Sequence, residues 1–176
     1  MLEFLWDFEI SILCRIIFLM KRLLLIPLVL FLLFCQNDYE KVEVTDVIVK
    51  SGVSFGFCRG YCKSDIEIVN RGVVFIASSW SDPNYPDIML NDNISIQEWD
   101  SLIESVDMDI LLSMEDIIGC PDCYDGGGEW IEIIKANTIK RVTFEYGSTV
   151  EPIQNLIEKV KVIRERFYCE VFPDKC

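Results

Sequence analysis

The fold is decided by residues 65–77, which read Asp-Ile-Glu-Ile-Val-Asn-Arg-Gly-Val-Val-Phe-Ile-Ala. Ile66 and Ile68 alternate with acidic residues, as in a strand that has one buried face. Asn70-Arg71-Gly72 is typical of a tight turn, and the apolar run 73–77 predicts a returning strand. The stretch therefore predicts an antiparallel hairpin.

Three further segments have the composition of strands. They are residues 41–50, 129–134 and 139–146, the last two joined by a turn at 136–138. Between the strands, glycine, proline, asparagine and aspartate predict loops. The predicted loops are residues 51–62, 81–93 and 119–128.

Two helices are predicted. The first starts at Ser95, which forms a capping box with Glu98, and Ile94 can pack onto Trp99 across this start. Residues 109–114 can add a further helical turn. The second helix runs from about residue 151 to 167, with Pro152 in its first turn.

The second helix has two distinct faces. Apolar residues recur at helical spacing and predict a buried stripe of Ile153, Leu156, Ile157, Val160, Ile163 and Phe167. The outer face is expected to carry Lys159, Lys161, Arg164 and Arg166. Together with the strands, this order predicts an α+β fold, a mainly antiparallel sheet of four to five strands with two helices packed on one face.

The start of the chain has the layout of an export signal. Met20-Lys21-Arg22 is followed by an apolar run from Leu23 to Phe34 and then by Cys35. This run has the length of a signal-peptide core and is too short to span a bilayer. We therefore expect residues 1–19 to be an over-extended start and residues 20–35 to be a lipoprotein signal peptide.

Leu32-Leu33-Phe34-Cys35 resembles a lipobox, although lipoboxes prefer a small residue where Phe34 stands. In such signals the cysteine is lipidated and becomes the first residue of the mature protein. An uncleaved signal anchor is the alternative. In either case we expect residues 36–41 to be a tether and residues 42–176 to be one domain outside the cytoplasm.

The charge balance and the absence of histidine exclude several functions. The net charge is −13, and it stays −13 after removal of residues 1–35, so nucleic acid is not an expected partner. The lack of histidine excludes Ser-His-Asp and Cys-His nucleophiles, His-ligated metals and c-type haem. We expect no enzyme activity and no cofactor.

Six cysteines follow Cys35, namely Cys58, Cys62, Cys120, Cys123, Cys169 and Cys176. An even set in a small exported domain predicts structural disulfides. Six cysteines allow 15 pairings, of which we expect only that Cys169 pairs with Cys176. Three alternatives remain: a thiol-disulfide site at 120–123, a four-cysteine metal site from Cys58, Cys62, Cys120 and Cys123, and free thiols.

Oxygen ligands and aromatic rings suggest two other sites. Asp122, Asp125 and Glu129 surround three glycines and are weak candidates for a calcium site. Trp80, Tyr85 and Trp130 are candidates for a sugar-binding face.

Three blocks of sequence carry a resemblance to known families. They are residues 54–62 with Cys58-Arg59-Gly60-Tyr61-Cys62, residues 119–132 with Gly119-Cys120-Pro121-Asp122-Cys123, and residues 142–146. They resemble exported lipoproteins of Bacteroidota type, and the first block is also similar to a domain-of-unknown-function family with a C-x-G-x-C motif. The resemblance covers roughly residues 51–167 and implies an envelope location and a compact α+β domain. Cys169 and Cys176 lie outside the shared pattern.

Together these features predict a lipoprotein of the cell envelope, attached to the outer membrane through lipid on Cys35 and facing the periplasm or the cell surface. We expect a binding or structural module whose partner is a protein or a small molecule. The alternative is a thiol-active or cysteine-ligated metal-binding envelope protein.

Overall fold

The structure is a computed structural model, and it describes residues 47–176. The expectations for the start of the chain, the signal peptide, Cys35 and the tether lie outside the described residues. Within residues 47–176, no helix is both long and apolar enough to cross a bilayer.

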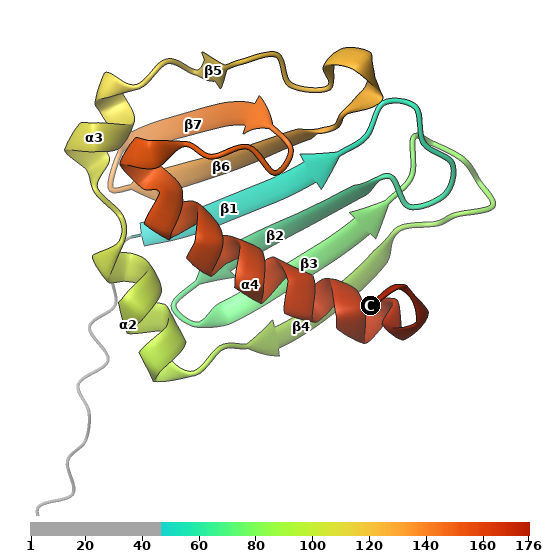
Figure 1. The fold of residues 1–176 in the computed structure, drawn as a ribbon. Helices are drawn as coiled ribbons and strands as arrows, with labels where there is room; N and C mark the ends of the chain where they lie inside the picture. Colours follow the sequence, from blue (N-terminus) through green and yellow to red (C-terminus); the bar gives the residue numbers. More distant parts are fainter. Residues whose placement is uncertain (1–46) are drawn as a thin grey trace, which may run out of the picture. The chain divides into compact units, whose positions relative to one another are not determined.

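One sheet of seven strands organises the described residues (Figure 1). Its spatial order is β4-β3-β2-β1-β6-β7-β5. The strands are β1 (Val47–Ser54), β2 (Lys63–Val69), β3 (Gly72–Ser78), β4 (Ile88–Asn93), β5 (Ile117–Ile118), β6 (Gly128–Lys135) and β7 (Thr138–Glu145). All neighbours pair antiparallel except β5, which runs parallel to β7.

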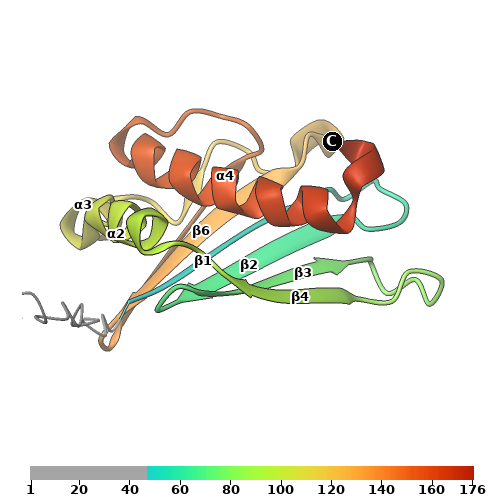
Figure 2. The same ribbon diagram turned by 90° about the horizontal axis from the view of Figure 1, so that it is seen from below.

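The three α-helices of residues 47–176 lie on one face of this sheet, and among these residues no helix covers the other face, which we call the open face (Figure 2). They are α2 (Ile96–Glu104), α3 (Met108–Ser113) and α4 (Gln154–Val171). Short 3-10 turns occur at Cys123–Asp125, Glu151–Ile153 and Pro173–Lys175. Alternate side chains of the strands point at the helices and form one core, which includes Val49, Phe75, Ile133 and Phe144.

The predicted α+β class with antiparallel pairing is confirmed, but the predicted number of elements is wrong. Residues 47–176 contain seven strands where four to five were expected, and three α-helices where two were expected. The additional strands are β4, which falls in the predicted loop 81–93, and β5, which falls between the predicted helical turn 109–114 and the predicted loop 119–128. Each lies at an edge of the sheet and has one neighbour, so its own sequence carries only weak strand signals.

The limits of β1 also differ from the prediction. The strand continues to Ser54 through Gly52, where a loop was expected. A Cβ at Gly52 would lie 2.7 Å from the Trp130 ring, and it would also collide with Asp65. Glycine is therefore required in the middle of this strand because neighbouring side chains cross its backbone.

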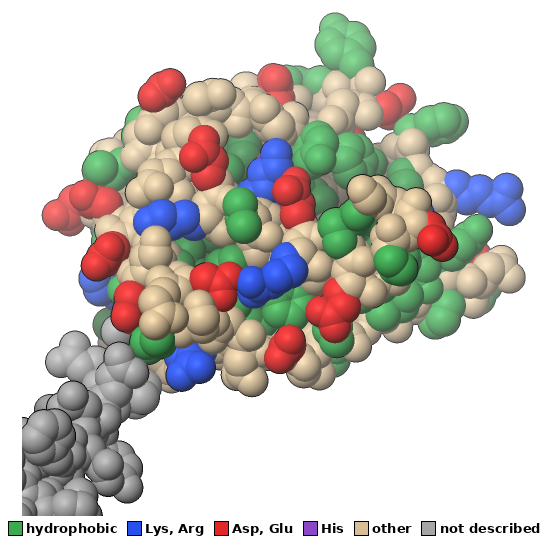
Figure 3. Space-filling view, turned by 60° about the horizontal axis from the view of Figure 1, so that its bottom comes forward, with side chains coloured by type: hydrophobic (Ala, Val, Ile, Leu, Met, Phe, Trp, Pro, Cys, Tyr) green, Lys and Arg blue, Asp and Glu red, His purple; other side chains and the backbone are tan. Residues whose placement is uncertain are grey.

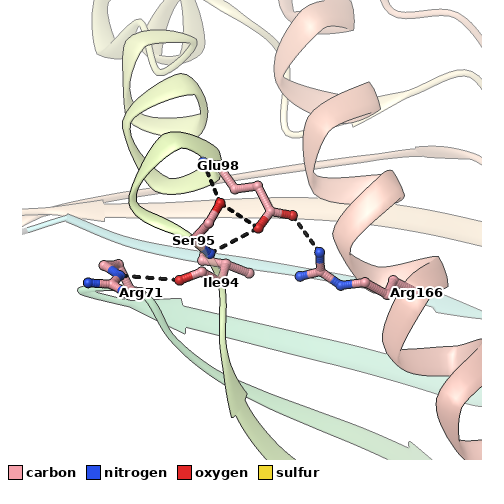
Figure 4. Close-up of polar contacts among 5 residues, drawn as sticks. All are labelled: Arg71, Ile94, Ser95, Glu98 and Arg166. Atoms are coloured by element: carbon pink, nitrogen blue, oxygen red, sulfur yellow. Dashed lines mark hydrogen bonds and ion pairs between the residues drawn. The ribbon is translucent and has the colours of Figure 1, made fainter.

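The predicted start of α2 is confirmed (Figure 4). Ser95 Oγ accepts a hydrogen bond from the Glu98 N–H, and Glu98 Oε2 accepts one from the Ser95 N–H at 2.9 Å. Ile94 and Trp99 are both buried, as the predicted packing across the helix start requires. The other carboxylate oxygen of Glu98 pairs with Arg166, which ties α2 to α4.

Candidate functional site

All six cysteines that follow Cys35 are paired with near neighbours. The bridges are Cys58–Cys62, Cys120–Cys123 and Cys169–Cys176. Their Cα atoms are 5.5–5.6 Å apart, a usual separation for disulfides. The predicted disulfides are therefore present, and the expected pairing of Cys169 with Cys176 is confirmed.

The three bridges gather at one end of the sheet, the end at which β1 and β7 finish (Figure 1). The loop 55–62 joins β1 to β2, the loop 119–127 leads into β6, and the third bridge closes the end of α4. We call this the cysteine end of the domain. Val47 lies at the opposite end of β1, roughly 23 Å away at the usual rise of a strand.

Asp122 connects two of the bridged loops. Its Oδ1 atom accepts hydrogen bonds from the N–H of Gly56 at 3.1 Å and of Gly127 at 3.2 Å. Gly127 has a φ of 86°, and a Cβ there would lie 2.5 Å from the Phe55 ring. The Asp122 carboxylate and the absence of a side chain at Gly127 thus let the two loops pack together.

The three carboxylates proposed for calcium are not brought together. Asp122 is bonded to the two loops, and Asp125 is exposed in the 3-10 turn. Glu129 is buried and pairs with Arg164. Across residues 47–176, no three side chains of cysteine, aspartate or glutamate lie close enough to share a metal ion.

The aromatic residues proposed for sugar binding have separate packing partners. Trp80 donates its ring N–H to the Phe55 carbonyl oxygen at 2.8 Å. Tyr85 packs edge-on against Tyr61, with ring centroids 5.6 Å apart. Trp130 lies on the open face of the sheet, where the guanidinium of Arg141 covers its ring.

Arg164 is the largest departure from the sequence prediction. It was expected on the outer face of α4, but it is only 3% exposed. Its Nη2 atom donates to Glu129 Oε1 at 2.6 Å, and Nη1 donates to Ser51 Oγ at 2.7 Å. The helix thus places a cation against the inner face of β1 and β6, where a buried carboxylate and a hydroxyl compensate its desolvation.

Arg164 lines a pocket at the cysteine end, with a volume of about 380 Å³. The end of β1, the start of β2 and the second half of α4 surround it. Its aromatic lining residues are Phe55, Tyr61, Tyr146 and Tyr168, its charged ones are Lys63, Arg164, Glu165 and Lys175, and its sulfur atoms belong to Cys62, Cys169 and Cys176. Two of the three disulfides therefore form part of its wall.

Aromatic contacts hold the pocket walls in place. Phe55 and Tyr146 meet edge to face, with ring centroids 5.0 Å apart. On the other side, Phe172 lies between Tyr61 and Tyr168, at centroid distances of 5.1 and 4.9 Å. The residues of this pocket come from four separate segments, so no local pattern in the sequence predicts it. The one local feature of the sequence that relates to the pocket is a basic residue next to the buried stripe of the last helix.

The pair Cys120–Cys123 lacks the surroundings of a reactive dithiol. A reactive first cysteine usually lies at the N-terminus of an α-helix, where the helix dipole favours the thiolate. Here the pair leads into a single 3-10 turn, Cys123–Asp125, and then into β6. Cys120 is nevertheless exposed to solvent.

No family model matches the chain, and no curated protein has a sequence detectably similar to it.

Proposed function

We propose that this chain is a lipoprotein of the cell envelope, tethered to the outer membrane through Cys35, whose domain binds a partner at its cysteine end. One observation carries this proposal: every cysteine after Cys35 is bridged. Bridges of this kind persist in oxidising compartments and are rare in the cytosol. The sequence before Cys35 offers a signal for export into such a compartment.

The position of the pocket supports binding as the role of the domain. The chain enters the domain at Val47, and the pocket is formed where β1 ends. If the domain is tethered through the segment before Val47, the pocket lies at the end of the domain that is far from the tether. The bridges would keep the pocket walls rigid before the ligand arrives, which lowers the entropy cost of binding.

Lipid attachment is tested by growing cells with an alkyne analogue of palmitate and measuring its incorporation. The native chain and a Cys14→Ser control should be labelled equally, since Cys14 lies before the predicted signal. Cys35→Ser should abolish labelling and release the protein from the membrane fraction. Labelling that survives in Cys35→Ser would refute lipid tethering.

The state of the cysteines is tested by alkylating the denatured chain without reductant, followed by mass spectrometry. We expect none of the six cysteines after Cys35 to react. Alkylation of Cys58, Cys62, Cys120 and Cys123 would contradict the proposal. It would favour a thiol-active or metal-binding envelope protein, a second function that the exposure of Cys120 favours.

A further inference from the structure

The pocket is locally cationic in a strongly acidic chain. The whole sequence has 16 basic and 29 acidic residues. On the face shown in Figure 3, basic side chains lie interspersed among acidic ones. Three basic residues, Lys63, Arg164 and Lys175, line the pocket with one acidic residue, Glu165. The charge of Arg164 is paired with the buried Glu129, and the ammonium group of Lys63 lies over the Trp80 ring at 4.6 Å. Among the described residues, Lys175 is therefore the basic lining residue that pairs with neither a carboxylate nor the Trp80 ring.

Arg164 lines the pocket although its side chain is almost fully buried, and not all of its donors have an acceptor within residues 47–176. A guanidinium has five N–H donors in a fixed planar arrangement. Among the described residues, two of them have acceptors, the oxygens of Ser51 and Glu129. The remaining donors match the geometry of a carboxylate, which can accept two parallel hydrogen bonds from one guanidinium.

Two groups of aromatic side chains in the lining provide apolar contact for a flat body. Phe55 and Tyr146 form one aromatic wall, while Tyr61 and Tyr168 belong to the other. Aromatic side chains bind rings through offset or edge-to-face packing. Lys175 lies 5.0 Å from the centroid of the Phe172 ring, which places its charge beside the second wall.

We propose that this pocket binds a small organic anion that has one carboxylate on a ring-sized apolar body. The carboxylate meets Arg164 and Lys175, and the ring lies between the aromatic walls. The volume of about 380 Å³ is near the lower limit of small-molecule sites, which favours a single ring with a short chain. This inference rests on the proposed binding role and names the ligand class.

The test is calorimetric titration of the full chain in detergent with benzoate, phenylacetate and 3-phenylpropionate, each compared with its neutral amide. At least one acid should bind about tenfold more tightly than its amide, since a charge-assisted pair is lost in the amide. Lys175→Gln should weaken acid binding by about three- to tenfold and thereby reduce the preference for acid over amide. Lys135→Gln, at the exposed end of β6, is the matched control and should change neither.

Two results would overturn the ligand class. One is the absence of saturable binding by any of the three acids. The other is equal binding of acid and amide, which would mean that the cations do not recognise charge. Lipid labelling at Cys35 and full bridging of the cysteines do not depend on these titrations. The ligand class can therefore fail while the tethered, bridged domain stands.

Discussion

At the scale of single residues, the pair of Arg164 and Glu129 is the most consequential contact. Both side chains are almost fully buried, and each is the other's charged partner. A buried pair is weak evidence of net stability, because two charges must leave water to form it. Removing one partner is different, since the remaining charge stays buried without compensation.

Arg164→Met should therefore lower the free energy of unfolding by about 3–5 kcal/mol. The measurement is urea denaturation followed by circular dichroism. The control is Arg166→Met, two residues later on the same helix, which removes the largely exposed pair with Glu98 and should cost no more than about 1 kcal/mol. Equal losses of unfolding free energy in the two variants would show that Glu129 is not buried without compensation when Arg164 is replaced.

A second residue with an unusual environment is Asp65, on the open face of the sheet above Gly52. Burial raises the pKa of its carboxyl group, and the nearby cations Lys63, Arg141 and Arg164 offset part of this effect. The folded state therefore holds this proton more tightly than the unfolded state does. Its contribution to stability is complete below the unfolded pKa of about 3.8 and is lost as the pH rises through the folded pKa.

Asp65→Asn should remove the loss of stability that the ionisation of Asp65 causes as the pH rises. Because asparagine does not ionise, the free energy of unfolding of the variant should fall less than that of the native chain between pH 3.5 and neutrality. The measurement is urea denaturation at a series of pH values for both proteins. An unchanged pH dependence would show that Asp65 is hydrated in the folded state.

At the scale of elements, the start of α2 is where local sequence and tertiary contact reinforce each other. The capping box satisfies two backbone N–H groups at the helix start, and Glu98 also reaches Arg166 of α4. The backbone hydrogen bond from Ser95 is the main reason that the pKa of Glu98 lies below its ordinary value of 4.5, and Arg166 adds to the effect. The cap thus favours the ionised carboxylate.

Ser95→Ala should destabilise the domain by about 1 kcal/mol at pH 7, the usual cost of losing such a cap. Ser101→Ala, in the interior of the same helix, is the control and should change stability by only a few tenths of a kcal/mol. The measurement is thermal or urea denaturation. An equal effect at both positions would contradict the role of the cap.

Glu98→Gln should show the opposite pH dependence to Asp65→Asn. A carboxylate with a lowered pKa contributes stability above its unfolded pKa and loses it as the pH falls through the folded pKa, here below 4.5. The difference in stability between native chain and variant should therefore be present at neutral pH and shrink under acid conditions. If the difference in stability between the native chain and the variant stays constant across this pH range, the effect of Glu98 on stability comes from packing alone.

At the scale of the whole molecule, the two ends of the sheet differ in construction. The end at Val47 is closed by the turns at 70–71 and 136–137. The cysteine end is built from longer loops held by two bridges, with the third at the end of α4. At the end of the domain that contains the pocket, disulfide bridges thus take the place of the regular backbone hydrogen bonds of tight turns.

The double substitution Cys169→Ser with Cys176→Ser should lower the free energy of unfolding by about 2 kcal/mol, as expected for a short closed loop. It should also weaken binding of the carboxylate probes, because Lys175 and both cysteines line the pocket. Denaturation and titration measure the two effects separately. Undiminished binding would show that the pocket does not need this bridge.

The sequence by itself determined the features that are local in the chain. Alternation along residues 65–77 predicted the hairpin of β2 and β3, the Ser95–Glu98 spacing predicted the start of α2, and the even set of cysteines predicted disulfides. The first two signals are contained in a few consecutive residues, whose side-chain periodicity or capping geometry requires no distant partner. The third requires only the number of cysteines, which does not depend on the fold.

Only the tertiary structure decided the burial of Arg164, the edge strands β4 and β5, and the pocket. Arg164 adjoins a polar face of α4 and becomes buried because Glu129 and Ser51, far away in the sequence, accept its hydrogen bonds. An edge strand gains its hydrogen bonds from a neighbour, and a pocket gains its walls from several segments. These features depend on strand register and helix packing, which arise from contacts between elements.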